Sequence, residues 1–162
     1  MQFLIFAVLA IITCIQAAPS ATVIDKSWGE PRGSTLTEGI KCIFLVGPFD
    51  CAKAKTDADN AGAEARNSYP PETLHNGIGD AFRHCYWNAL MTISIGRDQA
   101  KKVADLHEDN NTTGPYNERV MDLTNNEIGR QVGSDSKTAD EARAKCNEHV
   151  QTGYLQIQPS SD

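Results

Sequence analysis

The sequence predicts an all-α protein, a single-domain bundle of five or six helices joined by two disulfides. Three observations support this fold class. The segment from Gly79 to Ile95 contains no proline and no internal glycine, and its apolar residues recur at helical spacing. The segments around it alternate amphipathic runs with Gly and Pro breaks, and four cysteines remain for pairing once an apolar leader is removed.

The predicted centre of the fold is the helix within residues 75–95, HNGIGDAFRHCYWNALMTISI. Its apolar residues recur three or four positions apart, while Asp80, His84, Trp87 and Met91 form a narrow stripe on the opposite face. We expect such a helix to be covered on both sides, which buries the stripe. Buried polar groups need partners, because leaving one unpaired costs roughly 1–3 kcal/mol. A buried polar cluster follows.

Residues 1–18 carry no charged side chain and end in small residues, as is typical of a secretory signal peptide cleaved near Ala17 or Ala18. The apolar run is shorter than the roughly 20 residues that a membrane span needs. No later segment is long and apolar enough to be transmembrane. We therefore expect a secreted, extracellular protein.

About 144 residues remain after this leader, enough for one domain with a core. The net charge of -6 argues against a nucleic-acid partner and against electrostatic attachment to anionic membranes. We expect a monomer, and no residue pattern identifies its partner.

Cys42, Cys51, Cys85 and Cys146 remain when Cys14 leaves with the leader. An oxidising compartment favours two disulfides, for which three connectivities exist. We favour Cys42–Cys51 and Cys85–Cys146, since the second would tie the central helix to the last one and stabilise the fold by roughly 2–4 kcal/mol. Zinc coordination is the alternative, although the chain has no CxxC pair.

The other elements are expected in the following order. Residues 19–35 form an extended lead-in, residues 36–150 the helical domain and residues 151–162 a C-terminal tail that adds at most one short extended piece and otherwise frays. Within the domain, helices around the central one are predicted over residues 36–45, 49–69, 97–108, 119–133 and from a cap at Asp135 or Ser136 to about 150.

Spacing also predicts which side chains face inward. Ile40, Ile43 and Phe44 are expected inside on the first helix, and Gly129 and Gly133 should permit close approach of a neighbouring helix. Ala139 and His149 are expected inside on the last helix. Between the helices, Asn110 and Asn111 each begin an N-x-T sequon, which predicts a glycoprotein.

Polar side chains on three predicted helices converge on one interior. They are Asp80 and His84, then His107 and Glu108, then Asp122, Asn125 and Asn126. An Asp four residues before a His can orient the imidazole, as a general base or a metal ligand requires. A second carboxylate would complete a hard-cation site or a His–Asp dyad. The alternative is a polar network that fixes the helix register.

Arg83 lies on the same helix, and a covered guanidinium needs a carboxylate. Asp122, Glu108 and Glu127 are the expected partners, and a structural ion pair is favoured over a clamp for an anionic substrate. Trp87 can line a pocket, although an indole on a helical stripe is more often core.

The segments GIGDAFRHCYWNALM, VADLHED and MDLTNNEIGR together resemble a domain of unknown function found in secreted bacterial proteins. That domain carries a D-A-x-R-H-x-x-W helix, then an H-E pair, then an M-D-x-x-N-N-x-x-G helix. The resemblance covers residues 40–133 and implies a shared helical fold and polar centre without an established activity. It selects Asp80, Arg83, His84, Trp87, His107, Glu108, Asp122, Asn125, Asn126 and Gly129.

A fainter resemblance links D-A-F-R-H-C-Y to the catalytic helix of secreted phospholipases A2, where R-H-D-x-x-Y pairs a catalytic His with a calcium-binding Asp. Here Cys85 follows His84, and no Gly-rich calcium loop precedes this helix.

Two functions from different classes follow. The first is a non-catalytic extracellular protein, such as a matrix, venom or host-interaction component, whose cluster is architectural. The second is a metal-assisted or phospholipase-like hydrolase with His84 as general base, oriented by Asp80 or Asp122, and with Glu108 and Asn126 holding a metal or polarising the substrate. No cofactor is identified, and a divalent metal is the candidate. Exposure of His84 discriminates between the two, because a general base must be reachable.

Overall fold

The computed structural model describes residues 35–110 and 115–160, in which it forms six α-helices, one 3-10 turn and no strand. The expected leader and, apart from Thr35, the expected lead-in lie outside these residues. In chain order the elements are α1 (Thr35–Val46), α2 (Pro48–Ser68), η1 (Pro71–Thr73), α3 (Ile78–Ile95), α4 (Arg97–Asn110), α5 (Tyr116–Ser134) and α6 (Ala139–Gln151). The predicted all-α bundle of five or six helices is confirmed. None of the described helices is long and apolar enough to cross a membrane.

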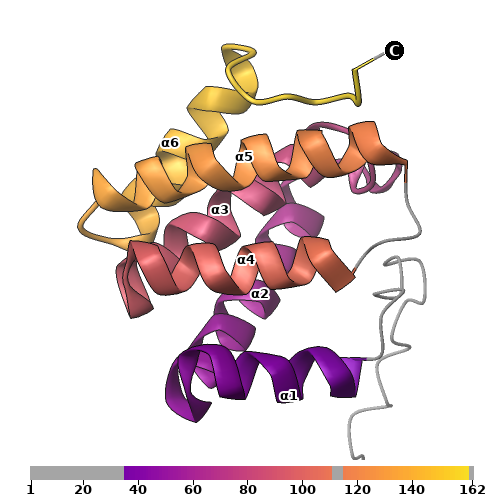
Figure 1. The fold of residues 1–162 in the computed structure, drawn as a ribbon. Helices are drawn as coiled ribbons and strands as arrows, with labels where there is room; N and C mark the ends of the chain where they lie inside the picture. The colour runs from indigo at the N-terminus through magenta and orange to yellow at the C-terminus, as the bar shows by residue number, and fades with distance from the viewer. Residues whose placement is uncertain (1–34, 111–114, 161–162) are drawn as a thin grey trace, which may run out of the picture.

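The helix α3 lies at the centre, as predicted, and packs against α2, α4, α5 and α6. Figure 1 shows α1, α4 and α5 one above another, with α3 and α2 behind them. Every residue of α3 from Gly79 to Thr92 is buried except Arg83, so both its apolar face and its polar stripe are covered. The helix begins after an extended Gly77 and ends at Gly96, whose φ of 86° lies in the left-handed region that glycine tolerates best.

Two glycines on α5 permit its close contact with α3. A Cβ atom on Gly129 would lie 2.2 Å from the carbonyl oxygen of Cys85, and one on Gly133 would lie 2.6 Å from that of Ala89. Both distances are shorter than any van der Waals contact, so only glycine fits. The predicted role of this pair is confirmed.

Both favoured disulfides are present. Cys42–Cys51 joins α1 to α2, and Cys85–Cys146 joins α3 to α6 across 61 residues of sequence. Their Cα–Cα distances of 5.7 and 6.0 Å are typical of disulfides. Zinc coordination by these four cysteines is therefore excluded.

The predicted orientation of α1 is wrong. Ile40, Ile43 and Phe44 are exposed, and the buried side chains of this helix are Cys42 and Val46. The disulfide explains the difference, because it requires the face that carries Cys42 to lie against α2.

Two other helix starts differ from the prediction. The helix α5 begins at Tyr116, three residues earlier than expected, because Pro115 stands before it, where a missing N–H costs nothing. The helix α6 begins at Ala139 behind Thr138, whose hydroxyl accepts a hydrogen bond from the Glu141 N–H. Thr138 replaces the expected caps at Asp135 and Ser136, and Ala139 is consequently exposed.

The segment after α6 contacts the helical domain at Leu155 and Gln156. Leu155 is buried in the core, and Asn125 exchanges two hydrogen bonds with the backbone of Gln156, at 2.8 and 3.0 Å. This amide forms the same pair of bonds that a neighbouring strand would form.

We expect Gly129→Ala to lower the free energy of unfolding by roughly 1–3 kcal/mol or more, because the added methyl must push α5 away from α3. Gly39→Ala on α1 is the matched control. A Cβ there meets nothing within 4 Å, so it should raise stability by up to about 1 kcal/mol. Urea unfolding measures both, and equal effects at the two positions would contradict the proposed close contact.

Candidate functional site

The imidazole of His84 forms the centre of a buried polar cluster, with only 2% of the residue exposed. It projects from α3 toward α4 and α5, and its two ring nitrogens face different groups. The convergence of three predicted helices on one interior is therefore confirmed.

Amide and carboxylate groups surround the Nδ1 atom of His84. The Oδ1 atom of Asn126 lies 3.1 Å from Nδ1, and the Oε1 atom of Glu108 lies 3.8 Å from it. Asn126 donates its Nδ2–H to Glu108 at 3.0 Å, and its Oδ1 also accepts from Asn88 at 2.6 Å. Because this amide oxygen can only accept, the Nδ1 atom must carry the ring proton.

Charged groups surround the Nε2 atom of His84. The Nη2 atom of Arg83 lies 2.8 Å away, and oxygens of Asp122 and Asp80 lie 3.4 and 3.6 Å away. With the proton on Nδ1, Nε2 accepts a hydrogen bond from the guanidinium. Burial, together with the charge of Arg83, lowers the pKa of His84 to about 4, so the ring is neutral near pH 7.

Asp80 is the ionised partner of Arg83. Its Oδ1 atom lies 2.5 Å from Nη2 of Arg83, and its Oδ2 accepts the backbone N–H of Asn76 at 2.8 Å. Burial would raise the pKa of Asp80, but Arg83, His84 and this N–H outweigh burial and lower it. The partner of Arg83 is thus a residue three positions earlier on its own helix, and not the expected Asp122, Glu108 or Glu127.

Asp122 differs from the other carboxyl groups of the cluster because one of its oxygens lacks a hydrogen bond within the described part of the chain. It projects from α5, is 9% exposed, and its Oδ1 atom has no hydrogen-bond partner among the described residues. Burial and the negative charge of Asp80 raise its pKa to about 7. This carboxyl group therefore changes protonation close to neutral pH.

Two residues that sequence reasoning missed extend the cluster. Asn88 is fully buried and its Oδ1 accepts a hydrogen bond from Arg130 at 2.9 Å. Arg130 in turn pairs with Glu127 at 2.7 Å. Spacing was the available signal, because Asn88 follows His84 by four residues and Arg130 follows Asn126 by four.

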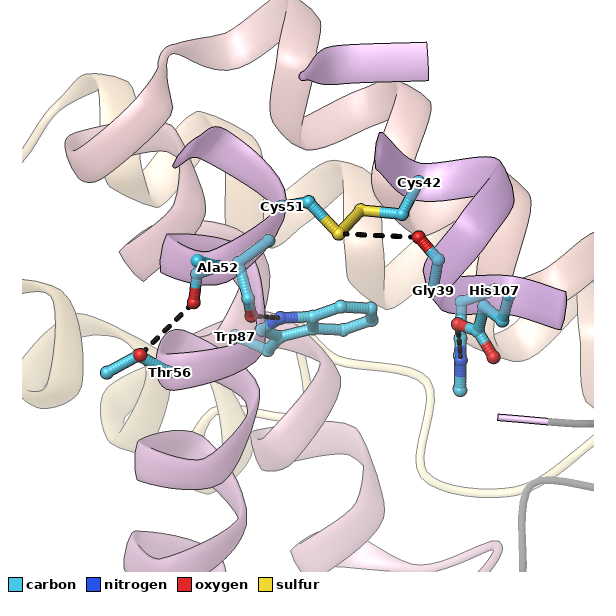
Figure 2. Close-up of a disulfide and its surroundings, with 9 residues drawn as sticks. Gly39, Cys42, Cys51, Ala52, Thr56, Trp87 and His107 are labelled. Carbon is cyan, nitrogen blue, oxygen red and sulfur yellow. Dashed lines mark hydrogen bonds and ion pairs between the residues drawn. A yellow bond between two sulfur atoms is a disulfide. The ribbon is translucent and has the colours of Figure 1, made fainter. Parts of the chain in front are cut away.

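Three of the predicted site residues lie elsewhere. His107 accepts or donates at 2.9 Å to Glu38 of α1, and it packs edge-on against Trp87 with ring centroids 5.4 Å apart. Trp87 donates its indole N–H to the Ala54 carbonyl of α2 at 3.1 Å, as Figure 2 shows. Asn125 binds the segment after α6 and does not contact His84.

The cluster has the ligand types of a divalent cation site. One ligand atom each from Asp80, His84 and Asp122 all lie within 4.8 Å of one another. Asn126 holds the far side of the imidazole, as an outer partner of a metal ligand does. Glu108 and Asn126, which the sequence suggested as metal-holding residues, lie on the Nδ1 side and orient the ring. A metal would instead be held on the Nε2 side, by His84, Asp80 and Asp122.

The molecule is thus an all-helical, disulfide-linked protein with a buried His/Asp/Asn centre. The chain belongs to the family described as a domain of unknown function (DUF6973), whose model matches residues 41–154. The match extends beyond the expected residues 40–133 and takes in α6. No solved structure matches the chain.

The pKa of Asp122 predicts how stability depends on pH. Its folded pKa of about 7 exceeds the ordinary 3.8, so the fold binds the proton more tightly and loses stability as the pH rises from about 4 to about 7. Asp122→Asn cannot ionise, and its stability should rise relative to the wild type over that range, by at most about 4 kcal/mol.

Denaturant unfolding at pH 4 to 8, with a chelator present, measures this difference. The depressed pKa of His84 acts in the opposite direction, giving stability above pH 6.5 that is lost toward pH 4, but both proteins share that contribution. Asp98→Asn changes an exposed carboxylate and should stay within about 0.5 kcal/mol of the wild type. A difference between Asp122→Asn and the wild type that does not vary with pH would refute the assignment.

Proposed function

We propose that this protein is a secreted, non-catalytic extracellular protein, a matrix, venom or host-interaction component, in which the central cluster is architectural. The uncharged leader sequence and its small residues at Ala17 and Ala18 support secretion. Two disulfides within the described residues support an oxidising compartment.

The burial of His84, with both ring nitrogens hydrogen-bonded, is the main support for an architectural role. A general base must reach a substrate proton directly or through one water, yet this ring is 2% exposed. Nδ1 bonds Asn126 and Nε2 bonds Arg83, so neither nitrogen has a free position. These bonds connect α3 to α5 and, through Glu108, to α4, which fixes the register of three helices.

The two candidate glycan sites differ. Asn110 ends α4, its Oδ1 accepts a hydrogen bond from Lys41 at 3.0 Å, and its Nδ2 is buried. A glycan needs that nitrogen exposed. Asn111 lies outside the described residues, and we propose it as the glycosylated position.

A metal-assisted hydrolase is the second candidate function, and the unpartnered Oδ1 atom of Asp122 favours it. Asp80, His84 and Asp122 would hold the metal, and a divalent cation there would lower the pKa of a bound water. The Nη2 atom of Arg83, 2.5 Å from Asp80, would have to leave its present place. A quarter of its side chain is exposed (25%), so the guanidinium has a direction in which to move.

Elemental analysis of the natively purified protein separates the two functions. The architectural function predicts no stoichiometric metal. It also predicts that His84→Ala lowers the free energy of unfolding by roughly 2 kcal/mol or more, since Asn126 and Arg83 lose a buried partner.

His75→Ala is the matched control, because His75 is exposed and its removal should change stability by less than about 0.5 kcal/mol. One equivalent of metal in the wild type that is absent from His84→Ala would support the hydrolase. So would an unchanged melting temperature in His84→Ala.

Expression with the natural leader in a eukaryotic secretion host tests the compartment. Mass spectrometry of the medium should find an N-terminus at Ala18 or Pro19 and a glycan removed by Asn111→Gln. Asn110→Gln should leave the glycan in place. Protein that stays in the cell fraction with residues 1–18 still attached would refute secretion.

A further inference from the structure

Apolar side chains are exposed together on α1 and at the start of α2. Among the described residues ten large apolar side chains are exposed, and six of these lie within residues 36–49. The six, here named the α1 patch, are Leu36, Ile40, Ile43, Phe44, Leu45 and Phe49. The two phenylalanines are 87% and 83% exposed, which is unusual for an aromatic ring in a folded domain.

The patch exists because α1 lies at the edge of the bundle. Figure 1 shows this helix at the lower edge of the molecule, with the other helices that the structure describes on one side of it. It packs against α2 and α4, and the buried members among its described side chains are Cys42 and Val46. The Cys42–Cys51 disulfide holds that face inward, so the opposite face stays in water. A monomer therefore leaves several large apolar side chains hydrated, which is unfavourable.

The size of the patch matches what an interface between two copies needs. An aromatic side chain offers about 150–250 Å² and an aliphatic one about 100 Å², so the exposed fractions amount to roughly 500 Å². An apolar patch of this size commonly marks an interaction site. Two copies placed face to face would remove on the order of 1,000 Å² from water, which is the lower bound for a specific interface.

The spacing of the patch fits a second helix. Leu36, Ile40 and Ile43 are separated by four and three residues, the intervals that place apolar side chains along the seam between two paired helices. When two copies of α1 pair in antiparallel order about a two-fold axis at Ile40, Leu36 of each copy meets Phe44 of the other. The apolar residues of this seam are thus complementary to themselves.

Charge favours a second copy over a charged partner or an anionic lipid surface. The charged side chains of α1 are Glu38 and Lys41, and each is bonded within its own chain, to His107 at 2.9 Å and to Asn110 at 3.0 Å. With a single cation, α1 lacks the basic residues by which an amphipathic helix binds an anionic membrane. A second copy brings no like charge into the seam.

We propose that the α1 patch is the interface of a homodimer, in which α1 packs in antiparallel order against α1 of a second copy. The sequence-based expectation of a monomer goes with Ile40, Ile43 and Phe44 inside the fold, and their exposure is the reason for revising it. The dimer goes beyond the proposed function, which assigns no partner. It involves neither His84 nor a metal.

Sedimentation velocity on the secreted mature protein tests the dimer. An interface of this size should dissociate in the micromolar range, so the weight-average mass should rise toward twice the monomer mass between about 1 and 200 µM. Raising the salt concentration from about 0.1 to 1 M should strengthen the association, because salt screens the repulsion between two chains of net charge -6 and leaves apolar contacts in place.

One substitution in the seam has a matched control. Phe44→Glu places a charge between the two helices and should keep the protein monomeric at every concentration. Tyr116→Glu changes another aromatic side chain, 79% exposed at the start of α5 and outside the patch, and it should dimerise as the wild type does. Both positions are exposed, so the melting curves of both variants should match that of the wild type.

A wild-type protein that stays monomeric up to about 200 µM overturns the proposal, as does a dimer that Phe44→Glu leaves intact. Two further results would overturn it by assigning the patch to another occupant. A monomer that floats with phosphatidylcholine vesicles and that Phe44→Glu releases would indicate a lipid surface. A monomer that dimerises once residues 19–34 are removed would indicate the lead-in. None of these outcomes depends on whether His84 is catalytic, so they are separate from the metal analysis that tests the proposed function.

Discussion

The close contact between α3 and α5 is the constraint on which the rest of the structure depends. Gly129 places the backbone of α5 against the carbonyl of Cys85, one residue after His84. At that separation the short amide of Asn126 reaches Nδ1 of the imidazole at 3.1 Å. A wider spacing would leave the Nδ1–H of His84 buried without an acceptor, at a cost of roughly 1–3 kcal/mol. The close packing of the two backbones is therefore what allows the buried polar side chains to form their hydrogen bonds.

The cluster is also organised by charge. Two arginines on two helices bound it, and each is paired with a carboxylate three residues away on its own helix: Arg83 with Asp80 and Arg130 with Glu127. Between the two arginines lie the side chains of His84, Asn88 and Asn126, with the carboxyl groups of Glu108 and Asp122 beside the imidazole. Such local pairing limits the penalty of burying charge, because neither partner depends on a distant segment to find its counter-ion.

Much of the fold could be predicted from sequence, because helical periodicity and glycine breaks are local signals. The central position of α3, the disulfide pairs and the glycine contact all follow from spacing and chemistry. The orientation of α1 could not, since apolar residues lie on more than one of its faces and only the disulfide selects the buried one. The start of α6 at Thr138 was missed because several neighbouring residues can cap a helix equally well.

The sequence predicts most of the residues that form the site, but it predicts their geometry less well. Which residues converge follows from their stripes, but which ring nitrogen each faces depends on side-chain directions that periodicity does not specify. His107 and Glu108 are adjacent in sequence, yet Glu108 enters the cluster while His107 turns to Glu38 and Trp87. Arg83 was paired with the wrong carboxylates because its nearest partner was already on its own helix.

The exchange between Asn125 and Gln156 has a practical consequence for anyone producing this protein. The family match stops at residue 154, but Leu155 is 3% exposed and Gln156 holds the Asn125 amide. A version trimmed to the matched boundary would uncover the core beside α5 and strand a buried amide one residue before Asn126. Expression vectors for this protein should therefore retain at least Leu155 and Gln156 beyond the boundary that sequence comparison suggests.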